Sequence, residues 1–73
     1  MNKNYENLAN AIVLQAAMDF RKALKTLKKY PCDRLALHTK REVMRFFRSD
    51  WYSSLTTVDP EILIHKLTEE VLG

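Results

Sequence analysis

The sequence predicts an all-α protein, a three-helix assembly with a long first helix and a short extra helical turn before the last helix. Glycine occurs once and proline twice in 73 residues, which leaves almost no turn chemistry for the hairpins of a β protein. Apolar residues also recur at steps of three and four, which is the helical period. Hydrophobic residues make up 47% and charged residues 29%, so we expect a single helical domain spanning residues 1–73.

The first helix is expected from about Asn4 to Lys29. It ends there because Tyr30 precedes Pro31, and the residue before a proline is pushed out of the helical region. Its predicted buried stripe follows the helical period over about six turns. The stripe consists of Tyr5, Leu8, Ala9, Ile12, Val13, Ala16, Ala17, Phe20, Ala23, Leu24 and Leu27.

The second helix is expected to begin after Asp33, whose side chain is the predicted N-cap, and to run to about Arg48. Ser49-Asp50 offers two alternatives, a break that caps a new helix or only a kink. The segment 51–56 is predicted to form one further helical turn. The apolar stripe of the second helix comprises Leu35, Ala36, Val43, Phe46 and Phe47.

The last helix is expected to start at Asp59-Pro60. Aspartate is a preferred N-cap, and proline is favoured at the first helical position because its missing N–H costs nothing there. Its predicted buried stripe is Ile62, Leu63, Ile64, Leu67, Val71 and Leu72.

Ala11, Leu14 and Met18 lie on the first helix opposite its main stripe. One interpretation is a contact with a second copy of the chain, giving a homodimer, or with another partner. The other, which the sequence slightly favours, is that the last helix or the aromatic turn covers these residues.

Charge is distributed unevenly along the chain. Between Arg21 and Arg48 ten basic residues stand against two acidic ones, a local charge of +8, whereas the rest of the chain carries −5. Part of this asymmetry complements helix dipoles. The remainder indicates an acidic partner, either phosphates or an anionic protein surface.

Five cationic side chains fall within about 80° of one another on the second helix, since their spacings are four, three, four and three. Four of them are arginines, whose planar fork suits bidentate contacts with phosphate or carboxylate. A solvated face is the alternative interpretation. The predicted partner-binding ridge is Arg34, His38, Arg41, Arg45 and Arg48, with Lys25, Lys28 and Lys29 near its start across the Pro31 turn.

The cluster Phe46, Phe47, Trp51 and Tyr52 is expected to be mainly core. Phe47 and Trp51, spaced by four, would share a buried face if the second helix continues. Tyr52 is the expected exposed member, and we include it among the partner-binding residues because it could stack on a base.

Two His-x-x-x-Glu pairs, His38/Glu42 and His65/Glu69, have a spacing that would suit a helical metal site. No HExxH motif accompanies them, so we expect neither a metal site nor a cofactor. The single Cys32 excludes an intramolecular disulfide, and no nucleophile–base–acid set is recognisable. We therefore expect no catalytic residues and a non-enzyme.

The longest apolar runs are far too short to span a bilayer, and no secretion signal is recognisable. The expected location is the cytoplasm, with no membrane partner.

The segment Phe46-Phe47-Arg48-Ser49-Asp50-Trp51-Tyr52-Ser53-Ser54-Leu55-Thr56, followed by Asp59-Pro60-Glu61 and Leu63-Ile64, resembles a family of small uncharacterised proteins encoded by phages and integrative elements of Gram-positive bacteria. The opening 8–16 and Asp19-Phe20-Arg21 are similar as well, so the likeness covers most of the chain. The resemblance implies a mobile-element context, in which small accessory proteins often act on host machinery or host defences. It implies no catalytic residues.

The expected function is thus a non-enzymatic accessory protein that binds an acidic macromolecular partner through the ridge, in host takeover or counter-defence. Two alternatives use the same ridge on phosphates. One is a nucleic-acid-binding or regulatory protein, and the other is a nucleotide-sequestering protein with Tyr52 on the base.

Overall fold

Four helices follow one another along the chain in the computed structural model, which describes residues 3–73, with side chains from Glu6 onward. The part of the chain so described contains no strand, so the all-α prediction is confirmed. The helices are α1 (Lys3–Lys29), α2 (Arg34–Phe47), α3 (Asp50–Leu55) and α4 (Pro60–Leu72).

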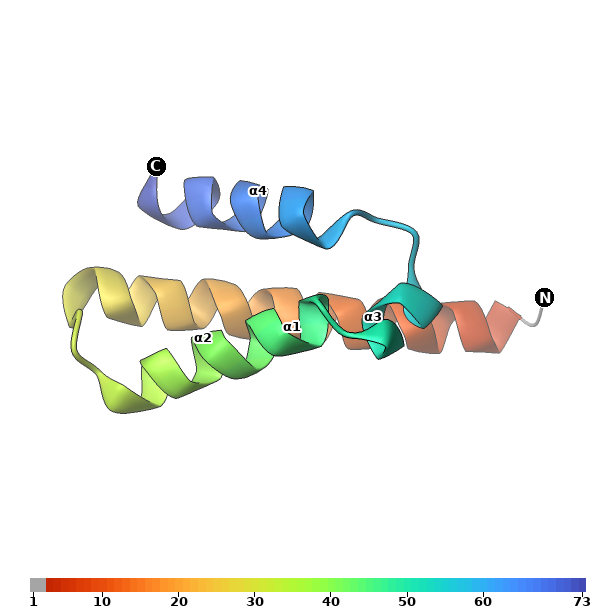
Figure 1. Cartoon of the computed structure of the whole chain (residues 1–73), viewed down its shortest axis with the longest axis horizontal. Coiled ribbons are helices and arrows are strands. Elements are labelled where there is room, and N and C mark those ends of the chain that lie inside the picture. The colour runs from red at the N-terminus through yellow and green to blue at the C-terminus, as the bar shows by residue number, and fades with distance from the viewer. Residues whose placement is uncertain (1–2) are drawn as a thin grey trace.

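The long helix α1 is the element on which the others pack. After the turn at Pro31, α2 runs back antiparallel to α1, and the six-residue α3 continues toward the N-terminal half of α1 (Figure 1). Helix α4 then returns in the same direction as α1, so that the C-terminus lies at the end of the molecule where α1 ends (Figure 1). The molecule is elongated, with extents of 43 × 22 × 18 Å.

Three side chains cap the three shorter helices. Asp33 accepts a hydrogen bond from the Ala36 backbone N–H at 2.9 Å, and Asp59 accepts one from the Glu61 N–H at 2.8 Å. Ser49 Oγ accepts from the Tyr52 N–H at 3.3 Å. Both predicted aspartate caps are confirmed, and Ser49-Asp50 is a break with a new cap rather than a kink.

The core is built from aromatic and aliphatic side chains of all four helices. Phe20, Phe47 and Tyr52 are almost completely buried, and their rings meet edge-on, with centroids 5.9 Å apart for Phe20–Phe47 and 5.6 Å for Phe47–Tyr52. Each such side chain stabilises the fold by about 1.5–3 kcal/mol. The other core members are Ala17, Leu24, Val43, Leu67 and Val71.

Four residues of the predicted stripes are exposed instead of buried: Leu8, Leu35, Ile62 and Leu72. Each lies about 100° or more around its helix from the most buried residues, and a helix in so small a bundle buries only a narrow face. Leu35, for example, is 76% exposed although Ala36 beside it is buried. The side chain of Tyr5 lies outside the described residues.

The predicted roles of Trp51 and Tyr52 are reversed. Trp51 is 59% exposed, whereas Tyr52 is 1% exposed and donates a hydrogen bond from its hydroxyl to the Val58 carbonyl at 2.9 Å. The prediction paired Phe47 with Trp51 on the condition that the second helix continued. The break at Ser49 resets the helical phase, and Tyr52 turns inward in place of Trp51.

The slightly favoured interpretation of the outer face of α1 is also wrong. Leu14 is 60% and Met18 57% exposed, so neither α4 nor α3 covers them. Along the described residues, no helix is long and apolar enough to cross a membrane.

Replacing Tyr52 by phenylalanine tests the buried hydroxyl. Tyr52→Phe should lower the free energy of unfolding by about 1 kcal/mol, a shift of about 4–8 °C in Tm, because the Val58 carbonyl loses its donor. Burial, with a smaller contribution from the charge of Asp59, raises the pKa of the Tyr52 phenol above its ordinary value of 10.0. The folded state therefore favours the protonated phenol, and its contribution is present below pH 10 and lost as the pH rises further.

Urea unfolding followed by circular dichroism at pH 7–11 measures both effects. Tyr30→Phe is the matched control, because Tyr30 is 60% exposed. Equal behaviour of the two variants at neutral and alkaline pH would show that the Tyr52 hydroxyl stabilises nothing.

Candidate functional site

All five residues of the predicted ridge are exposed; four of them lie on α2, and Arg48 is the C-cap that follows it. The buried residues of this helix are Ala36, Val43 and Phe47. At 100° per residue the ridge is centred on the side directly opposite that buried stripe. The helical period therefore explains both sets of positions, and the cationic side chains point away from the bundle.

Intramolecular carboxylates neutralise the ridge unequally. Among the side chains described, from Glu6 onward, Arg34, His38 and Arg41 form no ion pair. Arg45 Nη1 lies 3.8 Å from Glu42 Oε1, and the Arg45 side chain is mostly in solvent. A long, solvated contact of this kind contributes little free energy and leaves the guanidinium accessible.

Arg48 differs from the other four. Its Nε donates to Glu61 Oε2 at 2.9 Å and its Nη2 donates to Glu61 Oε1 at 3.0 Å. This two-point contact ties the end of α2 to the first turn of α4. Hydrogen bonding to Arg48 lowers the pKa of the Glu61 carboxyl, and the same bond raises the pKa of Arg48. We call the remaining four residues, Arg34, His38, Arg41 and Arg45, the open ridge.

The lysines at the end of α1 face a different neighbour. Lys28 Nζ donates to the Val71 carbonyl oxygen at 3.1 Å, in the last turn of α4. Carbonyls at a helix C-terminus lack intrahelical donors, so an ammonium group stabilises that end. Lys25, Lys28, Lys29 and Val71 surround an open hollow of about 450 Å³ there. Lys28 thus stabilises the contact between α1 and α4.

Tyr52 is not available to a partner, because it belongs to the core. Its burial overturns its predicted place among the partner-binding residues and its stacking role in the nucleotide alternative. The signal that could have placed it correctly is the Ser49 cap, because a new helix begins there.

The histidines do not assemble a metal site. His65 Nε2 lies 3.7 Å from Glu69 Oε2 on the surface of α4. Among the described side chains, no three His, Cys, Asp or Glu residues lie close enough to hold a metal ion. Cys32 is exposed in the turn between α1 and α2.

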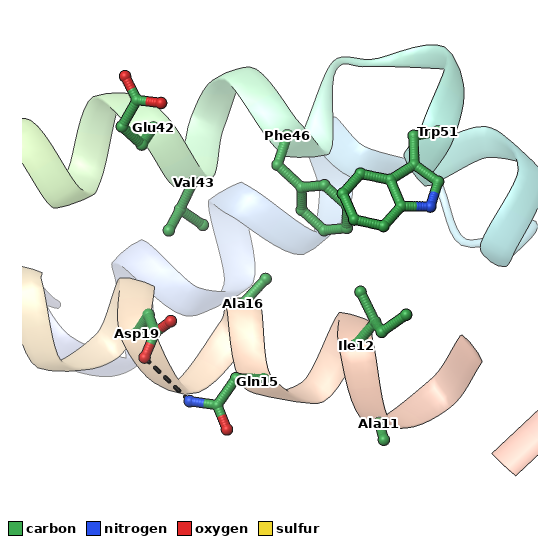
Figure 2. Close-up of a pocket in the computed structure, with 9 residues that line it drawn as sticks. All are labelled: Ala11, Ile12, Gln15, Ala16, Asp19, Glu42, Val43, Phe46 and Trp51. Atoms are coloured by element: carbon green, nitrogen blue, oxygen red, sulfur yellow. Dashed lines mark hydrogen bonds between the residues drawn. The ribbon is translucent and has the colours of Figure 1, made fainter. Parts of the chain in front are cut away.

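The structure also contains an open apolar groove of about 430 Å³ that sequence reasoning missed. Figure 2 shows Ile12 and Trp51 at one end and Asp19 and Glu42 at the other. Asp19 Oδ1 accepts a hydrogen bond from Gln15 Nε2 at 3.0 Å. Because the groove needs Trp51 to turn outward, no pattern within a single helix reveals it. Its lining is Ala11, Ile12, Gln15, Ala16, Asp19, Glu42, Val43, Phe46 and Trp51.

Comparisons with protein-family models, with curated proteins and with solved structures gave no match for this chain.

Glu61→Gln tests the contact between α2 and α4. Because the folded state lowers the pKa of Glu61, its ion pair contributes stability above pH 4.5, the ordinary value for this carboxyl, and the contribution is lost as the pH falls further. The wild-type Tm should therefore fall more steeply below pH 4.5 than that of Glu61→Gln. Thermal unfolding at pH 7 and at several pH values below 4.5 measures the difference.

Glu6→Gln is the control, because Glu6 is exposed and takes part in no ion pair of the described region. If the acid sensitivity of Glu61→Gln equalled that of the wild type, the ion pair would not tie α4 to α2.

Proposed function

We propose that this protein is a non-enzymatic helical binding module that docks an acidic macromolecular surface on the open ridge of α2. The observation that carries the proposal is the ridge itself. Four cationic positions share the solvent face of one helix, and within the described residues only Arg45 has a carboxylate nearby, at 3.8 Å.

Internal stability does not explain such a row. Like charges three and four residues apart on a helix destabilise it by about 0.2–0.5 kcal/mol per pair. Neighbouring residues of the open ridge have these spacings, and all of them are like-charged pairs when His38 is protonated. The pairs are Arg34/His38, His38/Arg41 and Arg41/Arg45. An external anion would remove this repulsion, which makes the ridge more useful for binding than for folding.

The length of the ridge favours a macromolecule. Arg34 and Arg45 are eleven residues apart, about 16 Å along the helix. A single phosphate or a mononucleotide contacts only part of that length, and the nucleotide alternative has also lost its stacking residue, Tyr52. An acidic protein surface or a nucleic-acid backbone can contact all four side chains together.

Between these two, the rest of the surface favours an acidic protein. Helix α4 carries three glutamates and a single lysine, Lys66, which makes it a poor recognition helix for a DNA groove. Helix α3 has only six residues and cannot replace it. Nucleic-acid binding through the ridge is the second candidate.

The resemblance to small proteins of phages and integrative elements supports a biological setting for this module. We place it among mobile-element accessory proteins that act inside the host cell on a defence or replication complex. The chain carries a net charge of +3, so such an action would not proceed by mimicry of DNA, which requires an acidic surface.

Charge reversal on the ridge tests the proposal. Arg41→Glu combined with Arg45→Glu should weaken binding to an acidic protein at least about tenfold, while helicity and Tm stay nearly unchanged because both side chains are in solvent. Polyglutamate serves as the first probe, followed by any host protein that co-purifies with the wild type. Fluorescence anisotropy measures the affinity.

The single variants Arg41→Glu and Lys66→Glu form a matched pair, since both alter the net charge equally and Lys66 is exposed on α4. If the two variants lost equal binding affinity, only the net charge of the protein would matter, and this result would contradict the ridge proposal. A duplex DNA probe separates the second candidate. Tighter binding to DNA than to the acidic protein probe, falling steeply as salt increases from about 50 to 200 mM, would favour nucleic acid as the ligand of the ridge.

A further inference from the structure

The ion pair between Arg48 and Glu61 lies at one end of the open ridge and faces solvent. Both side chains of the pair are more than half exposed. Arg48 follows Arg45 at a spacing of three and lies on the same face as the other ridge residues. A partner that contacts Arg45 therefore comes directly beside this ion pair.

We propose that Glu61 is an intramolecular competitor that autoinhibits the ridge, and that a carboxylate of the acidic protein partner displaces it from Arg48. This inference rests on the proposed function, because it concerns the regulation of the same site. With Arg48 released, the cationic surface would run from residue 34 to residue 48, about 21 Å along the helix instead of about 16 Å. Displacement of Glu61 thus lengthens the surface that the partner can contact.

The geometry of the pair explains why it inhibits. Glu61 accepts hydrogen bonds from Arg48 Nε at 2.9 Å and from Arg48 Nη2 at 3.0 Å, so one edge of the guanidinium is occupied. An arginine makes the same two-point contact with the carboxylate of another molecule. The Glu61 carboxylate also places a negative charge at this end of the ridge, which repels an approaching anion. A partner carboxylate must therefore replace Glu61 to use that edge of Arg48.

Solvent exposure makes the ion pair exchangeable. An exposed pair is weak in water, because each charged group is well solvated and salt screens their attraction. No charged side chain of the described region is buried, so separating this pair leaves no charge stranded in the core. Exchange replaces one contact of Arg48 by another and returns the Glu61 carboxylate to water. Competition by so weak a pair lowers the affinity for the partner by about two- to fivefold.

Helix α4 has other anchors and does not depend on this ion pair for its position. Leu67 and Val71 belong to the hydrophobic core. Arg21 Nε of α1 donates to Glu70 Oε2 at 2.6 Å, near the other end of α4. Loss of the contact with Arg48 therefore leaves α4 in place, and the exchange is a movement of side chains rather than of a helix.

Affinity for polyglutamate tests the competition. Glu61→Gln keeps the shape of the side chain, removes its charge and should bind polyglutamate about two- to fivefold more tightly than the wild type. Glu69→Gln is the matched control, because it removes the same charge about 12 Å farther along α4, where the carboxylate lies 3.7 Å from His65. Fluorescence anisotropy at about 100 mM salt measures both affinities, and circular dichroism verifies that the variants remain helical. Equal tightening in the two variants would overturn the inference, because only the net charge would then matter.

A double-mutant cycle tests whether Arg48 is the group that Glu61 withholds. Arg48→Gln should weaken binding in both backgrounds, but the loss should be about two- to fivefold greater in Glu61→Gln than in the wild type. The reason is that Arg48 of the wild type must first leave Glu61, whereas Arg48 of the variant is already free. An equal loss in the two backgrounds would refute the competition.

The ridge and its autoinhibition fail under different results. Weaker polyglutamate binding by Arg41→Glu/Arg45→Glu indicates that the ridge is the site, and if Glu61→Gln then behaves like its control, only the autoinhibition is wrong. If that charge reversal leaves binding unchanged, the proposed function is wrong and the inference falls with it. The same holds if neither the wild type nor Glu61→Gln binds polyglutamate.

Discussion

The break between α2 and α3 is the constraint on which the rest of the structure depends. Ser49 ends one helix by donating its hydroxyl to the Phe46 carbonyl at 2.6 Å and begins the next by capping the Tyr52 N–H. Because α3 begins anew at Ser49, its rotation differs from that of α2 and the Tyr52 side chain points into the core. There the Tyr52 hydroxyl donates a hydrogen bond to the Val58 carbonyl and so positions the segment that leads to α4. The residue just before the break, Arg48, then meets Glu61 of α4.

Local chemistry explains why the helix ends were predictable. It does not determine which of Trp51 and Tyr52 points into the core. Asp33, Ser49 and Asp59 act through hydrogen bonds to amides two or three residues away, so their effect is readable within a short segment. The relative rotation of α2 and α3 depends instead on two backbone residues between them. The sequence left both a break and a kink open at Ser49-Asp50, and the pairing of Phe47 with Trp51 applied only to a continuous helix. The break exchanges the expected roles of Trp51 and Tyr52 and forms the groove, which the sequence did not reveal.

The ridge was predictable in its position but not in its electrostatics. Positions on a helix follow from the period, and the burial of Ala36, Val43 and Phe47 places the opposite face in solvent. Whether an arginine on that face is already paired depends on carboxylates from elsewhere in the fold. Glu61 is thirteen residues from Arg48 in the sequence and belongs to another helix. Sequence spacing contains no information on that contact. The contact reduces the predicted ridge of five residues to the four of the open ridge.

The open ridge lies on a helix whose opposite side the core holds in place. Ala36, Val43 and Phe47 are the buried residues of α2, and the ridge is on the side that faces away from them. A partner could therefore bind the ridge without any rearrangement of the bundle. Charged contacts on a solvated face weaken as salt increases, whereas burial of apolar side chains in the core depends little on salt. Binding through the ridge would thus be sensitive to ionic strength under conditions in which the fold itself stays intact.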